Sequence, residues 1–294
     1  MRVGLMVEGQ EGVSWDQWLA LAEGCERYGI EAMFRSDHYL SLSDTTKAAT
    51  DAWTLLGALA SRTTRLRLGT LVSPVTFRHP SVLARAAATV DHVSGGRVEV
   101  GMGAGWMEAE HATFRFPFPE VSERVRVLSE QVEHVDRQLR HDPLTVQRPR
   151  PPLIVGGGAR RGTTVPAARL GDEYNTYGVD PPEAARRRRR LDAACEREGR
   201  DPSTLPFSLM TPFAFDRDHA HRYVERYPHS GPAEEWYDEL RRRGLAGDAK
   251  EIVAGLREFE ASGVERVMLQ HLVHDDLDVV AAIGREIAPA VSSR

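Results

Sequence analysis

The sequence predicts an α/β protein of the (β/α)8 TIM barrel class, built as one domain over residues 1–294. Short apolar strands alternate with amphipathic helices, eight strand segments occur, and no Gly/Ser-rich linker divides the chain. Such alternation indicates parallel strands joined by helical crossovers, which form either a doubly wound sheet or a closed barrel. Eight units favour the closed barrel, which commonly takes about 250 residues as one domain.

The strand segments are short runs of apolar residues. They are expected at residues 3–7, 31–35, 65–72, 97–101, 153–155, 172–175, 206–210 and 264–269. Helices fill the intervals, because apolar residues recur there at spacings of three and four. They are expected around residues 15–22, 52–59, 83–90, 125–139, 163–170, 182–198, 248–262 and 276–287. Two of them begin with a capping-box pair, Ser14 with Gln17 and Asp248 with Glu251.

Two stretches, residues 112–120 and 211–231, are rich in proline and aromatic residues and have no clear period. They are expected to be insertions over the C-terminal mouth of the barrel. The aromatic residues within 114–118 and 213–227 fit either the apolar wall of a substrate pocket or ordinary packing.

The composition favours small-molecule chemistry in the cytoplasm. A net charge of −5 gives no electrostatic reason to expect nucleic acid or an anionic membrane as a partner. The five arginines at 186–190 lie among acidic residues in a predicted helix, which is typical of a solvated helix face. No segment approaches the roughly 20 apolar residues of a membrane span. The N-terminus lacks the apolar stretch of a signal peptide, and the two cysteines are too few for a disulfide framework.

In a barrel of this kind the ligand site lies where loops follow the C-terminal ends of the strands. The second strand is followed by Ser36-Asp37-His38, which places a carboxylate and an imidazole at the mouth. The fourth ends in Gly101-Met102-Gly103-Ala104-Gly105-Trp106, whose small residues let backbone approach a flat ligand. An adjacent Asp and His often form only a structural hydrogen bond or cap a loop. Their position at the mouth of the barrel favours a catalytic or binding role.

The fifth strand ends in a glycine-rich loop at residues 156–163, which then opens a helix. Free backbone N–H groups, the positive end of the helix dipole and the neighbouring Arg160 and Arg161 favour an anion there, phosphate above all. The loop lacks the ending of a nucleotide-triphosphate P-loop and comes too late for the usual dinucleotide fingerprint. Candidate metal ligands are Asp37, His38, Glu110, His111 and His271. Their spacing does not support a metal site, and none is expected.

The order and spacing of these segments resemble the luciferase-like monooxygenase superfamily over nearly the whole chain. Within it, the chain resembles the actinobacterial oxidoreductases that depend on the deazaflavin coenzyme F420. The segments that carry it are Phe34-Arg35-Ser36-Asp37-His38, Leu68-Gly69-Thr70, Arg78-His79-Pro80, residues 89–97, residues 101–106 with Glu110, the residue 156–163 loop, and Ala168-Arg169-Leu170-Gly171-Asp172.

The resemblance implies a cofactor lying across the mouth, with its ring system over strands two to four and its phosphate at the fifth-strand loop. His38 is then the candidate catalytic residue, as proton donor or charge stabiliser, and Asp37 is expected to hydrogen-bond the ring. A non-prolyl cis peptide behind the ring is expected at Leu71-Val72. The other implied cofactor contacts are Thr70, Leu71, Val72, Ala104, Gly105, Gly157, Gly158, Ala159, Arg160 and Thr163.

The implied activity is hydride transfer between F420 and an unidentified small organic substrate. Some relatives that oxidise sugar phosphates have a glutamate where this chain has Trp106, which disfavours that substrate. A monooxygenase that uses reduced FMN and a cofactor-binding protein without turnover stay open as alternatives, and a metal-dependent barrel isomerase ranks below them. The family also implies a homodimer through helices near strands two and three, although Leu55, Leu59 and Leu83 there fit packing against the barrel equally well.

Overall fold

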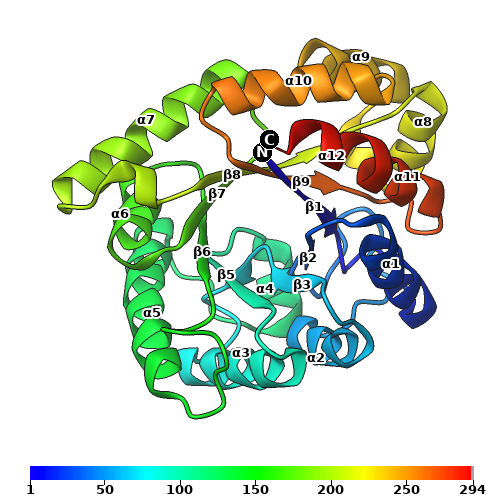
Figure 1. Ribbon diagram of the computed structural model, residues 1–294. Coiled ribbons are helices and arrows are strands. Elements are labelled where there is room, and N and C mark those ends of the chain that lie inside the picture. Colours follow the sequence, from blue (N-terminus) through cyan, green and yellow to red (C-terminus); the bar gives the residue numbers. More distant parts are fainter. Residues whose placement is uncertain (293–294) are drawn as a thin grey trace.

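The computed structural model describes residues 1–292, which form a closed parallel barrel surrounded by helices (Figure 1). The strands are β1 (Arg2–Val7), β2 (Ala32–Arg35), β3 (Arg67–Thr70), β4 (Ser73–Pro74), β5 (Val98–Gly103), β6 (Leu153–Gly156), β7 (Glu173–Tyr177), β8 (Phe207–Pro212) and β9 (Arg266–Gln270). They pair in the order β3-β2-β1-β9-β8-β7-β6-β5-β4, and an additional pairing of β3 with β5 closes the ring. The predicted (β/α)8 barrel is confirmed.

The third predicted strand, expected at residues 65–72, is shorter in the structure, and a second short strand follows it. β3 ends at Thr70, and β4 resumes at Ser73, where it pairs with Met102 of β5. The break falls at Leu71-Val72, whose peptide bond is cis, as expected from the resemblance. The Leu71 amide still donates to the Arg35 carbonyl at 2.8 Å, so the backbone leaves the ladder only at Val72.

Helices cover the outside of the barrel (Figure 1). They are α1 (Trp15–Tyr28), α2 (Ala52–Arg62), α3 (Pro80–Ser94), α4 (Glu108–Phe114), α5 (Val121–His141), α6 (Arg161–Leu170), α7 (Pro181–Arg197), α8 (Arg217–Arg226), α9 (Ala233–Arg242), α10 (Ala249–Ala261), α11 (Leu277–Ala282) and α12 (Ala288–Val291). A π-helical stretch, Ile283–Ile287, joins the last two. Both predicted capping boxes are present, at Ser14 and at Asp248. None of the helices within residues 1–292 is both long and apolar enough to cross a membrane.

The two stretches expected to be irregular contain helix, which corrects the prediction. α4 takes up the start of the first stretch, and α8 lies within the second. α8 has 10 residues and buries only His219, Ala220 and Tyr223. Its apolar residues are Ala220, Tyr223 and Val224, too few to fill the i, i+3, i+4, i+7 spacing by which the other helices are predicted.

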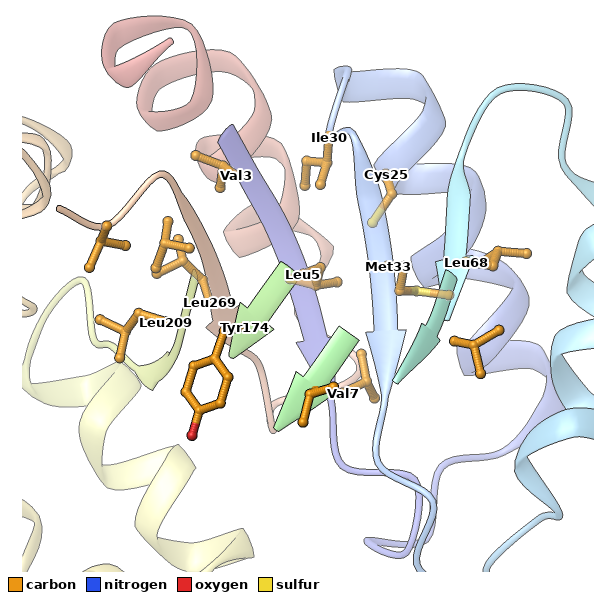
Figure 2. Close-up of a cluster of buried hydrophobic side chains, with 14 of the residues drawn as sticks. Val3, Leu5, Val7, Cys25, Ile30, Met33, Leu68, Tyr174, Leu209 and Leu269 are labelled. Atoms are coloured by element: carbon orange, nitrogen blue, oxygen red, sulfur yellow. The ribbon is translucent and has the colours of Figure 1, made fainter. Parts of the chain in front are cut away.

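The apolar residues form two layers. Val3, Leu5 and Val7 alternate along β1 and belong to the large cluster between strands and helices, together with Cys25 of α1 (Figure 2). The intervening side chains point into the barrel, where Met6, Ala32, Phe34, Leu71, Ile154 and Met268 form a separate cluster. This division follows from the two-residue period of a strand, and it makes the barrel interior a packed core.

A buried ionic cluster closes the barrel at the N-terminal ends of the strands. Arg266, the first residue of β9, contacts Glu99 at 2.7 Å, Glu173 at 3.2 Å and Glu31 at 2.9 Å, and its guanidinium lies 4.9 Å from the centre of the Phe34 ring. Its side chain is fully buried. This cluster lies at the end opposite the C-terminal ends of the strands, where buried polar residues of barrels contribute to stability. The active site of a barrel lies at the other end.

Candidate active site

A cavity of about 650 Å³ opens at the C-terminal ends of the strands. Each of the nine strands contributes to its wall, either through residues of the strand itself or through the loop that follows it, and Arg187 of α7 and Tyr227 after α8 complete it. They are Glu8, Gln10, Ser36, His38, Leu42, Leu71, Val72, Pro74, Gly103, Ala104, Gly105, Trp106, Met107, Gly156, Gly157, Gly158, Thr163, Asn175, Thr176, Tyr177, Arg187, Met210, Tyr227 and Gln270. The cavity therefore brings together eight of the twelve residues that the sequence nominated, which are His38, Leu71, Val72, Ala104, Gly105, Gly157, Gly158 and Thr163.

His38 is held by a buried carboxylate. Its Nδ1 lies 2.7 Å from Oε2 of Glu110, a fully buried residue of α4. The same carboxylate accepts the backbone N–H of Tyr39 and, at 3.1 Å, that of Leu40. Because a carboxylate only accepts, Nδ1 is the donor, and Nε2 has no partner within residues 1–292. Burial lowers the pKa of His38, but the hydrogen bond and charge of Glu110 outweigh it and raise that pKa above its ordinary value.

Trp106 stands next to this histidine. The two rings meet edge to face, with their centroids 5.6 Å apart, and the indole is 61% exposed. Its partly open position beside His38 makes it a wall for a ligand in the cavity. Of the two acids that follow it, Glu110 is turned to His38 and Glu108 is exposed outside the cavity.

Val72 projects into the cavity from the cis bulge, and glycines at the ends of two neighbouring strands make room for it. A Cβ on Gly156 of β6 would lie 2.9 Å from Cγ1 of Val72, and one on Gly103 of β5 would overlap Cγ2. Any larger residue at either position would push the valine side chain aside. The glycines at these strand ends therefore shape the floor on which a flat ring can rest.

Asp37 does not line the cavity, contrary to the ring contact expected of it. Its carboxylate accepts two hydrogen bonds from Arg78, at 2.5 and 3.0 Å, and one from the Ser73 hydroxyl at 2.6 Å. Thr70, also absent from the lining, is fully buried and donates to the Gly101 carbonyl at 3.1 Å. Both residues support the bulge from behind, because their partners belong to or follow the strands that flank it.

The loop between β6 and α6 offers the elements of an anion site. Thr163 and the glycines line the cavity, and a Cβ on Gly158 would meet nothing within 4 Å. α6 begins without a side-chain cap, so its first amides are available to a ligand. The Thr163 hydroxyl lies 2.8 Å from the Tyr174 hydroxyl, which accepts the Ala159 amide at 2.7 Å. These features fit the phosphate of a flavin-like cofactor.

Ala159 and Arg160 turn away from this cavity. Ala159 is buried with a φ of +54°, and Arg160 is exposed. Both line a separate hollow on the other side of the loop. Ala159 and Arg160, which the sequence placed around the phosphate, therefore do not line the cavity.

The floor of the cavity contains a polar network that the sequence reading missed. Glu8 accepts Nε2 of Gln270 at 2.6 Å and Nε2 of Gln10 at 3.1 Å. Gln270 in turn accepts the Tyr223 hydroxyl at 2.6 Å. Glu8 and Gln270 are polar residues at the ends of the first and last strands, so the rule that pointed to His38 could have found them.

The aromatic residues of the first insertion are not part of the wall. Phe114, Phe116 and Phe118 contact the rings of Tyr39, Phe77 and His111 outside the cavity, which is the ordinary packing alternative. Of the second insertion's described side chains, only that of Tyr227 lines the cavity. Within residues 1–292 no group of three His, Cys, Asp or Glu side chains is arranged to hold a metal ion.

The family model for luciferase-like monooxygenases matches residues 1–286, so the chain belongs to the luciferase-like monooxygenase family. Three curated relatives are each named F420-dependent glucose-6-phosphate dehydrogenase. The one from Segniliparus rotundus is 38% identical over 109 residues, which are 37% of this chain and 32% of the relative. The one from Microbacterium testaceum is 31% identical over 173 residues, 53% of this chain and 51% of the relative. The one from Nakamurella multipartita is 27% identical over 270 residues, 91% of this chain and 77% of the relative.

Solved structures share the fold. An F420-dependent secondary alcohol dehydrogenase in complex with an F420–acetone adduct superposes with a TM-score of 0.79 at 20% identity, covering 99% of both chains. A monooxygenase from Streptomyces bottropensis superposes with a TM-score of 0.80 at 21% identity, covering 99% of this chain and 98% of the other. The first two relatives match over only a third to a half of their own length, so neither their activity nor their substrate passes directly to this chain.

Proposed function

We propose that this protein is an F420-dependent oxidoreductase that transfers hydride between the deazaflavin and a small organic substrate in the cavity. The observation that carries the proposal is the His38–Glu110 pair, which faces the Val72 bulge and the β6–α6 loop across one cavity. The curated relatives named as F420-dependent enzymes support the choice of cofactor. The coenzyme supplies two-electron chemistry at its ring.

The residues of the chain take distinct parts. Gly157, Gly158, Thr163 and the first turn of α6 hold the phosphate, and the backbone of Ala104 and Gly105 borders the chain between phosphate and ring. Leu71 and Val72 back the ring. His38 donates the proton, or stabilises the charge, that accompanies hydride transfer, and its raised pKa favours the protonated form that this needs. Asp37 and Thr70 act as positioning residues.

The substrate is small and carries no phosphate. Apart from His38, which is paired with Glu110, the only cation among the described side chains of the cavity wall is Arg187, and its Nε already contacts Glu183 at 3.1 Å. Glu8 adds a carboxylate to the floor. Leu42, Trp106 and Met210 supply an apolar wall that suits an uncharged molecule.

A monooxygenase that uses reduced FMN is the second candidate, because the same apolar wall would keep water from an oxygen-reactive ring. Equilibrium titration of the purified protein with F420 and with FMN separates the two. We expect F420 to bind more tightly than FMN. Tight binding of FMN without binding of F420 would make the FMN-dependent monooxygenase the preferred function. A His38→Ala variant that kept full turnover would favour a cofactor-binding protein, or remove His38 as the catalytic residue.

We further propose a single barrel domain over residues 1–294, a cytoplasmic location and a homodimer. Both cysteines are buried and free, which suits a reducing compartment. Leu55, Leu59 and Leu83 are buried against the barrel and do not support a dimer, but Val82 and Val93 of α3 are 57% and 46% exposed. Light scattering on the purified protein tests the oligomeric state.

A further inference from the structure

One carboxylate in the wall of the cavity has no counter-charge. Glu8 directly follows β1, lines the cavity and is 8% exposed. Among the described side chains it accepts hydrogen bonds from two neutral amides, Nε2 of Gln270 at 2.6 Å and Nε2 of Gln10 at 3.1 Å, and it forms no ion pair with a Lys, Arg or His. An ionised carboxylate offers roughly four acceptor positions, so about two of them are left for a ligand.

Three other buried acids at this end of the barrel differ from Glu8, because each contacts a basic side chain. The pairs are Glu11 with Lys47 at 2.7 Å, Asp37 with Arg78 at 2.5 Å, and Glu110 with His38 at 2.7 Å. A buried charge is costly unless a partner compensates it. Glu8 is therefore a carboxylate that a cation from outside the chain can complete.

The two amides that hold Glu8 are themselves fixed. Oε1 of Gln10 accepts the Ser36 hydroxyl at 2.6 Å. Oε1 of Gln270 accepts the Tyr223 hydroxyl, also at 2.6 Å. Because each amide oxygen is engaged elsewhere, each amide nitrogen is turned to Glu8. The carboxylate is thus oriented before a ligand arrives, which lowers the entropic cost of binding to it.

The rest of the wall suits a small organic cation. Trp106, Tyr177 and Tyr227 line the same cavity, and aromatic rings attract cations. The two cations of the wall, His38 and Arg187, are already paired with acids and so do not neutralise Glu8. A positively charged nitrogen on an otherwise apolar molecule therefore matches both the carboxylate and the surface around it.

We propose that Glu8 binds the protonated nitrogen of the substrate and that the substrate is a small imine, an inference that rests on the proposed function. The uncharged imine suits the apolar wall, and its conjugate acid forms a charge-assisted hydrogen bond with the carboxylate. The carbon of the protonated C=N bond accepts a hydride from reduced F420, and the π electrons become a lone pair on nitrogen. That lone pair takes up the second proton of the reduced coenzyme. The products are an ammonium ion and oxidised F420, so Glu8 faces a cation both before and after the reaction.

Binding tests the inference without turnover. Pyrrolidinium and cyclopentanol have rings of the same size, one cationic and one neutral, and neither can be reduced by reduced F420. Titration calorimetry on the protein loaded with reduced F420 gives the dissociation constant of each. We expect pyrrolidinium to bind about tenfold more tightly, the order of one charge-assisted hydrogen bond. Equal binding, or tighter binding of cyclopentanol, would overturn the inference and leave the proposed function standing.

Turnover with reduced F420 compares 1-pyrroline, a cyclic imine, with cyclopentanone, its neutral counterpart. Glu8→Gln removes the charge at nearly constant shape and should lower the ratio of their kcat/KM values about tenfold, whereas Glu8→Asp keeps the charge and should retain part of the preference. Glu108→Gln, at an exposed acid outside the cavity, is the matched control and should leave the ratio unchanged. A ratio that stays the same in Glu8→Gln would overturn the inference alone. A protein that binds no F420 would overturn the proposed function, and the inference with it.

Discussion

Glu110 Oε2 lies 2.7 Å from His38 Nδ1 and so connects helix α4 to the end of strand β2 across the mouth of the barrel. The carboxylate is fully buried, and its other oxygen accepts two backbone N–H groups of the loop that follows His38. Glu110 therefore fixes the loop after His38, the orientation of the imidazole ring and the proton on Nδ1. Nε2 is then the ring nitrogen that can exchange a proton with a ligand.

Glu110→Gln should shift the pH dependence of turnover. Without the Glu110 carboxylate, only the charges of Glu8 and Asp37 oppose the effect of burial on His38, so the pKa of its ring falls. In the direction in which His38 donates a proton, kcat/KM declines as pH rises through that pKa, and the decline should move to lower pH in the variant. Glu108→Gln, an exposed neighbour on the same helix, is the control and should leave the profile unchanged. An unmoved profile for Glu110→Gln would remove the assigned role.

The same pair predicts how stability varies with pH. Because the folded protein raises the pKa of His38, the stabilisation is fully present below the unfolded value of about 6.5 and is lost as pH rises through the folded value. The unaltered protein should therefore exceed Glu110→Gln in free energy of unfolding by about 1.5–3 kcal/mol near pH 6. The difference should narrow toward pH 9. Urea unfolding at several pH values measures it, and a gap that widened with pH would contradict the charge assignment.

Much of the site could be predicted because active-site residues of barrels lie at the C-terminal ends of the strands. The pattern of apolar residues predicts where those strands end. That rule brought His38, the glycines of β5 and β6 and Thr163 to one cavity. The rule also pointed to Asp37, but the carboxylate of Asp37 is turned away from the cavity because it accepts hydrogen bonds from Arg78, 41 positions further along the chain. The rule covers Glu8 and Gln270, which lie at strand ends, but it does not predict that they pair with each other across 262 positions. Pairings at such separations leave no trace in local periodicity.

Asp37→Asn should destabilise the fold more than it impairs chemistry. The side chain of Asp37 is 1% exposed, and it neutralises Arg78, so the variant leaves a largely buried cation with a weaker partner. Asp51 still contacts Arg78 at 2.7 Å, which limits the loss to about 2–3 kcal/mol. Asp51→Asn, at a carboxylate that is 38% exposed, should cost less. Thermal unfolding compares them, and an equal or reversed order would show that Asp37 is not the main counter-charge.

Two glycine variants distinguish the structural role of the Val72 bulge from the proposed phosphate-binding role of the β6–α6 loop. Gly156→Ala should destabilise the empty protein by about 1–3 kcal/mol, because the new methyl group meets Val72 at 2.9 Å. Adding Val72→Ala should restore most of that loss. Gly158→Ala should leave the empty protein almost unchanged, since its Cβ meets nothing within 4 Å, yet weaken F420 binding. Normal F420 affinity in Gly158→Ala would mean that the phosphate lies elsewhere.

The wall of the cavity predicts discrimination against phosphorylated substrates. The two cations that the described residues place in the cavity wall, His38 and Arg187, are already paired with Glu110 and Glu183. A phosphate there would also meet the carboxylate of Glu8 on the floor. Burying a dianion without a free counter-charge is costly, whereas an uncharged alcohol or ketone fits the apolar wall. We therefore expect kcat/KM with F420 to be higher for a simple secondary alcohol than for glucose 6-phosphate. Glu8→Gln should narrow the difference by removing the repulsion, and efficient oxidation of glucose 6-phosphate by the unaltered protein would refute this account of the pocket.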